Sequence, residues 1–202
     1  MTKQNRGIFI CIEGLDGSGK TTQAKRLVKN LRQRGFDAVY TTEPTKGEVG
    51  RFIRRFVLNR EMRVSAPLEA LLFAADRVDH VKTEIKSWLK QNKVVVCDRY
   101  VYSSLAYQGA AGLNLKWIEH INQFALKPNL SLLIDVPPGV VVKRLKKKKT
   151  VMESAQNLKK VREIYLNLEQ EQDLTIVDGE KPLNEVAENI LEIALGLLKT
   201  KT

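Results

Sequence analysis

The sequence predicts an α/β fold in which a five-stranded parallel sheet is flanked by helices. Short apolar runs alternate with longer segments of helical periodicity, a pattern typical of parallel strands joined by crossover helices. The first run, Gly7–Glu13, is apolar at nearly every position and therefore fits a strand that is covered on both faces. A glycine-rich loop then leads directly into a helical pattern, which favours a three-layer sandwich.

The first helix, Lys20–Arg34, is predicted from an apolar stripe with helical spacing. The stripe comprises Ala24, Leu27, Val28 and Leu31. Gly35 follows it, and a glycine just beyond a helix commonly ends that helix in a left-handed conformation.

The remaining elements follow from the same two patterns. Four further apolar runs predict the strands Ala38–Thr42, Val94–Asp98, Leu130–Val136 and Leu174–Val177. Helical patterns predict Glu48–Asn59, Pro67–Gln91, Leu115–Phe124, Pro138–Lys147, Glu153–Glu171 and Leu183–Leu198. Pro67 and Pro138 each lie in a first helical turn, where proline is tolerated. In such sheets ligands collect beyond the carboxyl ends of the strands, which singles out the residues that follow each strand.

The loop after the first strand carries the phosphate-binding pattern G-x-x-x-x-G-K-T. Its residues are Gly14, Leu15, Asp16, Gly17, Ser18, Gly19, Lys20, Thr21 and Thr22. Glycines allow the backbone to wrap a phosphate, and the helix N-terminus adds aligned N–H groups. In such loops the lysine reaches the β- and γ-phosphates and the Thr21 hydroxyl ligates Mg²⁺. A chance match has a frequency of roughly one in a hundred chains of this length, and the strand before and the helix after lower it further. We therefore expect a nucleoside triphosphate site.

Asp98 and Arg99 follow an apolar strand and extend the expected site. A carboxylate at a strand tip beside a phosphate-binding loop holds Mg²⁺, directly or through water. The alternative is an Asp98 that only caps a turn. Arg99 offers a bidentate contact to a second phosphate, which an enzyme with a phosphorylated acceptor would need.

Composition bounds the class of protein. At 202 residues, with 43% hydrophobic and 28% charged residues, we expect one globular domain over residues 1–202. The polar start, Met1 to Arg6, and the lack of a long apolar run predict neither a signal peptide nor a membrane span. Cys11 and Cys97 lie inside strand patterns and are expected as buried thiols in a reducing cytoplasm. The net charge of +11 is compatible with nucleic-acid binding, but aromatic residues are not interleaved with the basic runs, which disfavours it. Phosphorylated small ligands and a plain solvated, lysine-rich surface remain as alternatives.

Four blocks of sequence resemble the thymidylate kinase family. They are Glu13 to Thr22, Thr42-Glu43-Pro44, Leu72-Phe73-Ala74-Ala75-Asp76-Arg77, and Asp98-Arg99-Tyr100 with Ser103-Ser104, Ala106-Tyr107-Gln108-Gly109. Further similarity includes Leu133 to Pro138 and Val161-Arg162 with Tyr165-Leu166, so the resemblance covers most of the chain. It implies the fold of nucleoside monophosphate kinases and transfer of the ATP γ-phosphoryl group to dTMP in dTTP biosynthesis. It also implies Mg²⁺ dependence and a homodimer.

The resemblance implies roles for individual residues. Phe73 would stack on thymine, Arg77 would donate to its O4, and Tyr107 would pack against the deoxyribose. Ser104 and Gln108 would complete the polar edge of the base pocket, and Arg99 would bind the acceptor phosphate. Asp16 would approach the 3′-hydroxyl or the metal shell. Glu43 and Pro44 would shape the acceptor loop, with Arg51 and Arg54 available to the acceptor phosphate.

Plainer interpretations of these residues remain open. Phe73 and Tyr107 sit on patterns that also suit core packing, and Arg77 follows Asp76, with which it could form only a surface ion pair. The nearest rival function is a kinase for another nucleoside monophosphate. A second rival is an ATPase that acts on nucleic acid or protein, although the chain has no spare length for a partner-binding module.

A mobile lid is expected at about residues 144–156. Relatives without a basic residue inside the phosphate loop often have an arginine-rich lid, whereas this stretch is mostly lysine. Lysine neutralises charge but lacks the bidentate fork of arginine. Candidates for the contact with the transferred group are Arg144, Lys148, Lys149 and Arg162. The alternative is a solvated run of lysines at a helix end.

Overall fold

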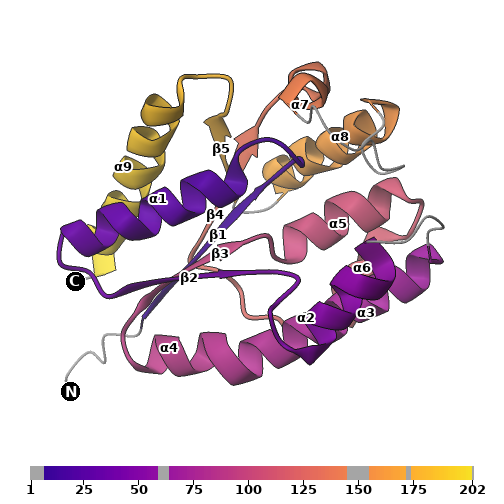
Figure 1. The fold of residues 1–202 in the computed structure, drawn as a ribbon, viewed down its shortest axis with the longest axis horizontal. Coiled ribbons are helices and arrows are strands. Elements are labelled where there is room, and N and C mark those ends of the chain that lie inside the picture. The colour runs from indigo at the N-terminus through magenta and orange to yellow at the C-terminus, as the bar shows by residue number, and fades with distance from the viewer. Residues whose placement is uncertain (1–6, 59–63, 145–154, 172–173, 202) are drawn as a thin grey trace.

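Five parallel strands form the sheet that the sequence predicts, and helices cover both of its faces (Figure 1). The computed structural model describes residues 7–58, 64–144, 155–171 and 174–201. The strand order is β2-β3-β1-β4-β5, so β1 lies at the centre. The strands are β1 (Ile8–Gly14), β2 (Ala38–Thr42), β3 (Val94–Asp98), β4 (Leu130–Asp135) and β5 (Leu174–Asp178). The predicted fold class is confirmed, and each strand matches its expected range to within one residue at either end.

Burial of β1 explains why its sequence is apolar throughout. Every residue of β1 is buried, and successive side chains point to opposite faces of the sheet. Ile10 packs with Leu27 of α1 (Lys20–Gln33) in the core on one face. Phe9 packs with Ile85 in a smaller core on the other face.

The helices account for the predicted helical segments, with two π-helical insertions. They are α2 (Glu48–Ile53), α3 (Ala66–His80), α4 (Lys86–Lys90), α5 (Val101–Ala110), α6 (Leu115–Ile121), α7 (Pro138–Arg144), α8 (Ala155–Glu171) and α9 (Leu183–Lys201), with η1 (Arg54–Leu58) after α2 and η2 (Val81–Ile85) between α3 and α4. The helix predicted over 67–91 is therefore a continuous α-π-α segment. The expected helix ends at Asn59, Lys147 and Glu153 lie outside the described residues. No helix in the described ranges is both long and apolar enough to cross a bilayer.

Helix α5 was not predicted. Tyr102, Leu105 and Ala106 have the i, i+3, i+4 spacing of a buried helical face, and all three are buried. The run contains two Tyr and two Ser, residues of modest helix propensity, which obscures that periodicity. The omission matters because α5 carries several of the expected site residues.

Candidate active site

The glycine loop between β1 and α1 forms a cleft of about 220 Å³. Gly14, Gly17 and Gly19 have φ values of 141°, 83° and 100°, in which a side chain would be strained. At Gly14 a Cβ would also lie 2.6 Å from the Ile134 carbonyl oxygen. The cleft is lined by Asp16, Gly17, Gly19, Lys20, Thr21, Thr22 and Arg99, and we call it the loop cleft.

The predicted loop residues do not all face this cleft. The Leu15 side chain is buried in the hydrophobic core, and its carbonyl oxygen accepts a 2.7 Å hydrogen bond from Lys20 Nζ. Ser18 is buried, and its hydroxyl has no hydrogen-bond partner among the described residues. Buried polar groups are normally satisfied, and Ser18 is not among the residues that line the loop cleft.

Lys20 is held in an electrostatically unusual place. Its side chain is buried, and burial, reinforced by the nearby Arg99, lowers the pKa of Lys20 to about 8. A desolvated cation beside loop N–H groups attracts anions, and bound anions would favour its charged form. The loop cleft therefore suits a polyphosphate.

Thr21, which lines the loop cleft, contacts Asp98 where α1 begins and β3 ends. The Thr21 hydroxyl donates to Asp98 Oδ2 at 2.5 Å, and Tyr40 OH lies 3.4 Å from the same oxygen. Asp98 Oδ1 is buried and, within the described part of the chain, has no hydrogen-bond partner. A hydroxyl and a carboxylate with a spare buried oxygen are hard ligands of the type that Mg²⁺ prefers, so these residues fit that ion.

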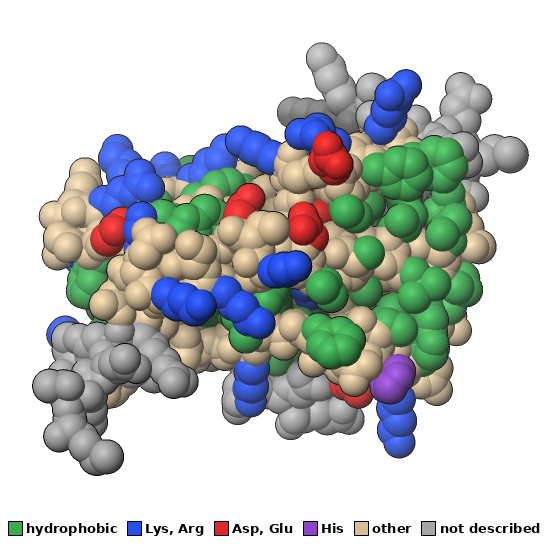
Figure 2. Space-filling model, turned by 90° about the horizontal axis from the view of Figure 1, so that it is seen from below, with side chains coloured by type: hydrophobic (Ala, Val, Ile, Leu, Met, Phe, Trp, Pro, Cys, Tyr) green, Lys and Arg blue, Asp and Glu red, His purple; other side chains and the backbone are tan. Residues whose placement is uncertain are grey.

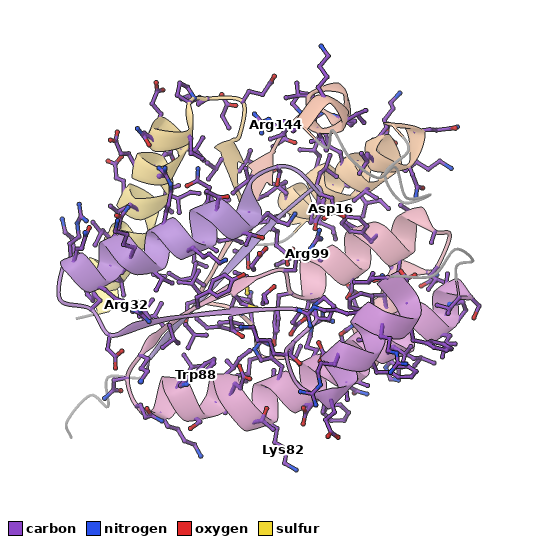
Figure 3. All side chains as sticks on the ribbon, viewed as in Figure 1. Asp16, Arg32, Lys82, Trp88, Arg99 and Arg144 are labelled. Carbon is purple, nitrogen blue, oxygen red and sulfur yellow. The ribbon has the colours of Figure 1, made fainter. Side chains whose placement is uncertain are left out.

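Arg99 and Asp16 form an ion pair beside the loop, where the end of β1 faces α5 (Figure 3). Tyr107 of α5 is close to both: its hydroxyl lies 3.1 Å from Asp16 Oδ2, and its ring lies 5.1 Å from the Arg99 guanidinium carbon. Burial opposes ionisation of Asp16, but Arg99 and Lys20 hold the pKa of Asp16 below its ordinary value. Arg99 has a φ of 71°, a left-handed conformation unusual for a residue with a side chain.

A second cleft, of about 170 Å³, adjoins the loop cleft. We call it the acceptor cleft. It is lined by Asp16, Glu43, Pro44, Leu58, Glu69, Phe73, Arg77, Arg99, Tyr100, Ser103, Ser104, Tyr107 and Gln108. Asp16 and Arg99 line both clefts, so an anion in either one would lie near the same guanidinium.

Arg77 is buried and held from three places in the fold: the loop after β2, the start of α5 and the end of α6. Its Nε and Nη2 lie 2.9 and 2.7 Å from Glu43 Oε2, and Nη1 donates to Asn122 Oδ1. Nη2 also lies 3.1 Å from both the Tyr100 carbonyl oxygen and Ser104 Oγ. Burial disfavours the charge, but Glu43 raises the pKa of Arg77 above its ordinary value. The plain interpretation of Arg77 as one half of a surface ion pair with Asp76 is therefore wrong, since Asp76 instead accepts from the Thr45 N–H and hydroxyl.

Other predicted residues lie outside both clefts. Arg51 is exposed, donates to the Lys46 carbonyl and lies 3.8 Å from Glu48. Arg54 donates to two backbone carbonyls, those of Pro44 and Thr45, and so braces the acceptor loop.

The basic residues expected in the lid are only partly described. Arg144 donates to the Gly179 carbonyl at 3.2 Å. Arg162 makes two 2.7 Å bonds to the Asp135 carboxylate. Lys148 and Lys149 lie outside the described residues, as does most of the stretch 144–156.

Sequence reasoning missed several polar residues that build the site. Glu13 is fully buried in β1, accepts from the Tyr100 N–H and the Ser103 hydroxyl, and thereby fixes the start of α5; burial raises the pKa of Glu13. Glu69 accepts from Gln108, and Asn122 accepts from Arg77. An acidic residue inside an otherwise apolar strand was a signal for Glu13. The sequence carried no comparable signal for Asn122.

The comparisons with known proteins agree with one another. A family model described as thymidylate kinase matches residues 12–190. A protein of Pyrococcus abyssi called probable thymidylate kinase is 46% identical over 196 residues, which cover 93% of this chain and 96% of the relative. Proteins with the same description from Thermococcus gammatolerans and Methanocaldococcus jannaschii are each 43% identical, over 92% and 95% of this chain and 94% and 96% of their own lengths.

Proposed function

The chain belongs to the thymidylate kinase family, a phosphotransferase family that converts ATP and dTMP to ADP and dTDP, and we propose that its two adjoining clefts are the sites of that reaction. ATP would bind by its phosphates in the loop cleft, and dTMP would bind in the acceptor cleft. The observation that carries the proposal is that Asp16 and Arg99 line both clefts. A phosphoryl group passing from one cleft to the other would cross beside Arg99.

The chemistry needs positioning and charge neutralisation more than proton transfer. An oxygen of the dTMP phosphate attacks the γ-phosphorus, and the bond from that phosphorus to the β,γ-bridging oxygen breaks, which releases ADP. The attacking oxygen is already ionised at neutral pH, so no general base is required. Lys20 and Arg99 would stabilise negative charge on the donor and acceptor oxygens as they approach.

Mg²⁺ fits the pair Thr21 and Asp98, and these residues would hold it directly or through water. When bound, the ion would neutralise charge on the β- and γ-phosphates. The support is the unpartnered buried oxygen of Asp98 beside the Thr21 hydroxyl.

The acceptor cleft supports recognition of a pyrimidine deoxynucleotide. Phe73 would stack on thymine and Arg77 would donate to O4, while Ser104 and Gln108 complete the polar edge. Tyr107 would pack against the deoxyribose, where its bond to Asp16 restrains it. Glu43 and Pro44 would form the wall opposite α5, with Arg51 available only if the acceptor loop changes conformation.

We further propose one domain over residues 1–202 with a lid at about 144–156. Arg144, Lys148 and Lys149 stay our candidates for the lid cation. Arg162 is a weaker candidate, because its Nε and Nη2 already donate to the Asp135 carboxylate. A cytoplasmic location is proposed because both cysteines are free thiols, as expected in a reducing compartment.

The assignment is tested by ADP release across a panel of nucleoside monophosphates. The expected order is dTMP, then dUMP, with dCMP, dGMP and AMP far behind. Loss of the thymine methyl costs about 1–3 kcal/mol in an apolar pocket, so dUMP should be a poor substrate. A preference for AMP or CMP would overturn the choice of acceptor while leaving the phosphate-binding loop intact.

ATP affinity should fall as the pH rises through 8. In the protein without ATP, the pKa of Lys20 is about 8, and bound phosphates would raise this pKa. Above pH 8, the binding of ATP is therefore accompanied by the uptake of a proton. If the bound value returns to the ordinary one, the Kd for Mg·ATP rises about eightfold between pH 7.5 and 9. Titration calorimetry measures both the Kd and the protons taken up. Lys20→Ala should bind weakly with no such slope, and a flat wild-type profile contradicts the prediction.

Apolar side chains on one end of the molecule support the proposed homodimer. Hydrophobic residues gather at the end that carries α2, α3 and α6 (Figure 2). The exposed large hydrophobic residues of α2 and α3 are Phe52, Leu68, Leu71 and Val78, and the exposed Phe124 follows α6. A patch of this kind is characteristic of a protein interface.

Leu71→Glu should convert the dimer to a monomer, because it would place a carboxylate in that apolar face. Light scattering after gel filtration measures the mass. Leu183→Glu is the matched control, since Leu183 is equally exposed at the start of α9, away from the patch. A wild-type mass of one chain at micromolar concentration would count against the dimer.

A further inference from the structure

His80 is a fully buried histidine that lines neither cleft. It ends α3, one turn after Arg77, and its side chain has no exposed surface. Both ring nitrogens have hydrogen-bond partners, so the orientation of the imidazole is fixed from both sides. A buried, doubly bonded histidine beside a recognition pocket needs a physical explanation.

The Nδ1 nitrogen of His80 contacts the Glu43 carboxylate, which in turn forms the ion pair with Arg77. Nδ1 lies 3.0 Å from Glu43 Oε1, and Arg77 takes the other oxygen, Oε2, through two nitrogens at 2.7 and 2.9 Å. A carboxylate gripped at each oxygen by a different side chain cannot rotate about its terminal bond without breaking one contact. His80 thus fixes Glu43 in the plane that Arg77 requires.

The other ring nitrogen of His80, Nε2, faces residues nearer the protein surface. Nε2 lies 2.7 Å from the Thr41 hydroxyl and 3.6 Å from Glu84 Oε2, and the Glu84 side chain is 38% exposed. Thr41 also lies 3.3 Å from that carboxylate. His80 is therefore anchored by β2 on one side and by the π-helical turn η2 on another.

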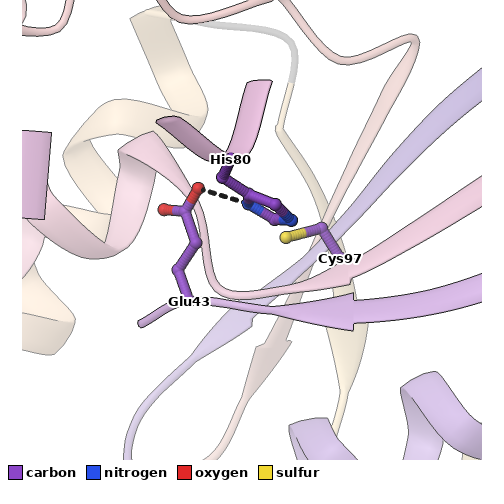
Figure 4. Close-up of side chains that lie close together, drawn as sticks. All are labelled: Glu43, His80 and Cys97. Carbon is purple, nitrogen blue, oxygen red and sulfur yellow. Dashed lines mark hydrogen bonds and ion pairs between the residues drawn. The ribbon is translucent and has the colours of Figure 1, made fainter. Parts of the chain in front are cut away.

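A metal site is a weaker explanation of the same cluster. Glu43, His80 and Cys97 bring ligand atoms within 4.8 Å of one another (Figure 4). However, Glu43 is already paired with the Arg77 cation, and burial raises the pKa of the Cys97 thiol well above its ordinary value. Both features oppose an added cation.

We propose that His80 is a positioning residue for nucleobase recognition, acting through Glu43 on Arg77. This inference rests on the proposed function, in which Arg77 reads the base. His80 touches no substrate; it holds the guanidinium in place before dTMP binds, and so lowers the cost of ordering it at the moment of binding.

Three variants at one position test the proposal. His80→Leu removes both contacts. His80→Asn keeps an amide N–H at the place of Nδ1, toward Glu43, whereas His80→Gln places its amide at the position of Nε2, where the amide oxygen can accept from the Thr41 hydroxyl. Lys82→Ala is the matched control, because Lys82 is exposed on η2 and points away from the clefts (Figure 3). The measurements are KM for dTMP and for ATP, kcat, the preference for dTMP over dCMP, and the melting temperature.

His80→Leu should raise KM for dTMP about tenfold and lower the preference for dTMP about tenfold, with KM for ATP and saturated kcat changed less than twofold. His80→Asn should restore most of this loss, and His80→Gln should not, even at equal melting temperatures. The proposal is overturned if Asn and Gln behave alike, or if KM for ATP rises in parallel. Should His80→Leu not fold, the comparison of Asn with Gln still decides. A wild-type enzyme without a preference for dTMP would refute the proposed function itself, whatever these variants do.

Discussion

Lys20→Ala is expected to lower kcat by about 10²- to 10³-fold, equivalent to about 3–4 kcal/mol of transition-state stabilisation. The Lys20 ammonium group is buried in the loop cleft, and Arg99 is the other cation lining that cleft. Among the described residues, the Lys20 ammonium group donates a hydrogen bond to the Leu15 carbonyl oxygen, which an incoming phosphate oxygen could replace. KM for dTMP should change far less than kcat, because dTMP binds in the other cleft.

The fold should survive this substitution. Burial disfavours the charged form of Lys20, as its lowered pKa indicates, so removing it also removes a desolvation cost. Melting curves of the variant should lie close to those of the wild type. Lys29→Ala, an exposed change on the same helix, is the matched control and should keep full activity. Near-normal turnover of Lys20→Ala would contradict the assignment of the loop cleft to ATP.

The strands could be predicted because burial on both faces leaves a strong local signal. Val94–Cys97 is apolar at every position, and the structure buries all five residues of β3, Asp98 included. The strand order could not be predicted in the same way, since residues far apart in the chain determine it. The π-helical turns also lacked a signal: η2 lies inside a segment whose apolar spacing suits an uninterrupted α-helix.

The same distinction between local signals and long-range packing applies to the residues of the candidate site. The loop Gly14–Thr22 and the tip residue Asp98 could be found because each lies within one short motif beside its strand. Arg77, Glu43 and Ser104 could be named only from the resemblance to a family, and the contacts that Arg77 makes could not be predicted. Glu43, Asn122 and Ser104 come from different elements, and only the packing of α3, α5 and α6 around the acceptor cleft brings them to one guanidinium.

Substitution of Arg77 should have the largest effect on substrate choice. Thymine presents an acceptor at O4, and cytosine presents a donor amino group there. Arg77 has only donors, so dCMP leaves a buried guanidinium facing a donor, and mismatches of this kind can reach about 10⁴-fold in kcat/KM. Arg77→Gln can offer either its N–H or its carbonyl to the base. It should reduce the preference for dTMP over dCMP to below about 10²-fold, mainly through loss of dTMP activity.

The control for Arg77→Gln must separate a loss of base recognition from a loss of stability, because the substitution leaves the buried Glu43 carboxylate without its ion-pair partner. Among the described residues, His80 would be the one remaining side chain in contact with the Glu43 carboxylate, and breaking a buried ion pair costs about 3–5 kcal/mol. The double variant Glu43→Gln/Arg77→Gln removes both charges and should regain much of the melting temperature without regaining selectivity. Competition between dTMP and dCMP in one reaction measures the ratio directly. If Arg77→Gln, alone or with Glu43→Gln, keeps the wild-type ratio, then Arg77 does not read O4, and its role is to brace Glu43 and α5 around a pocket that chooses its base by shape.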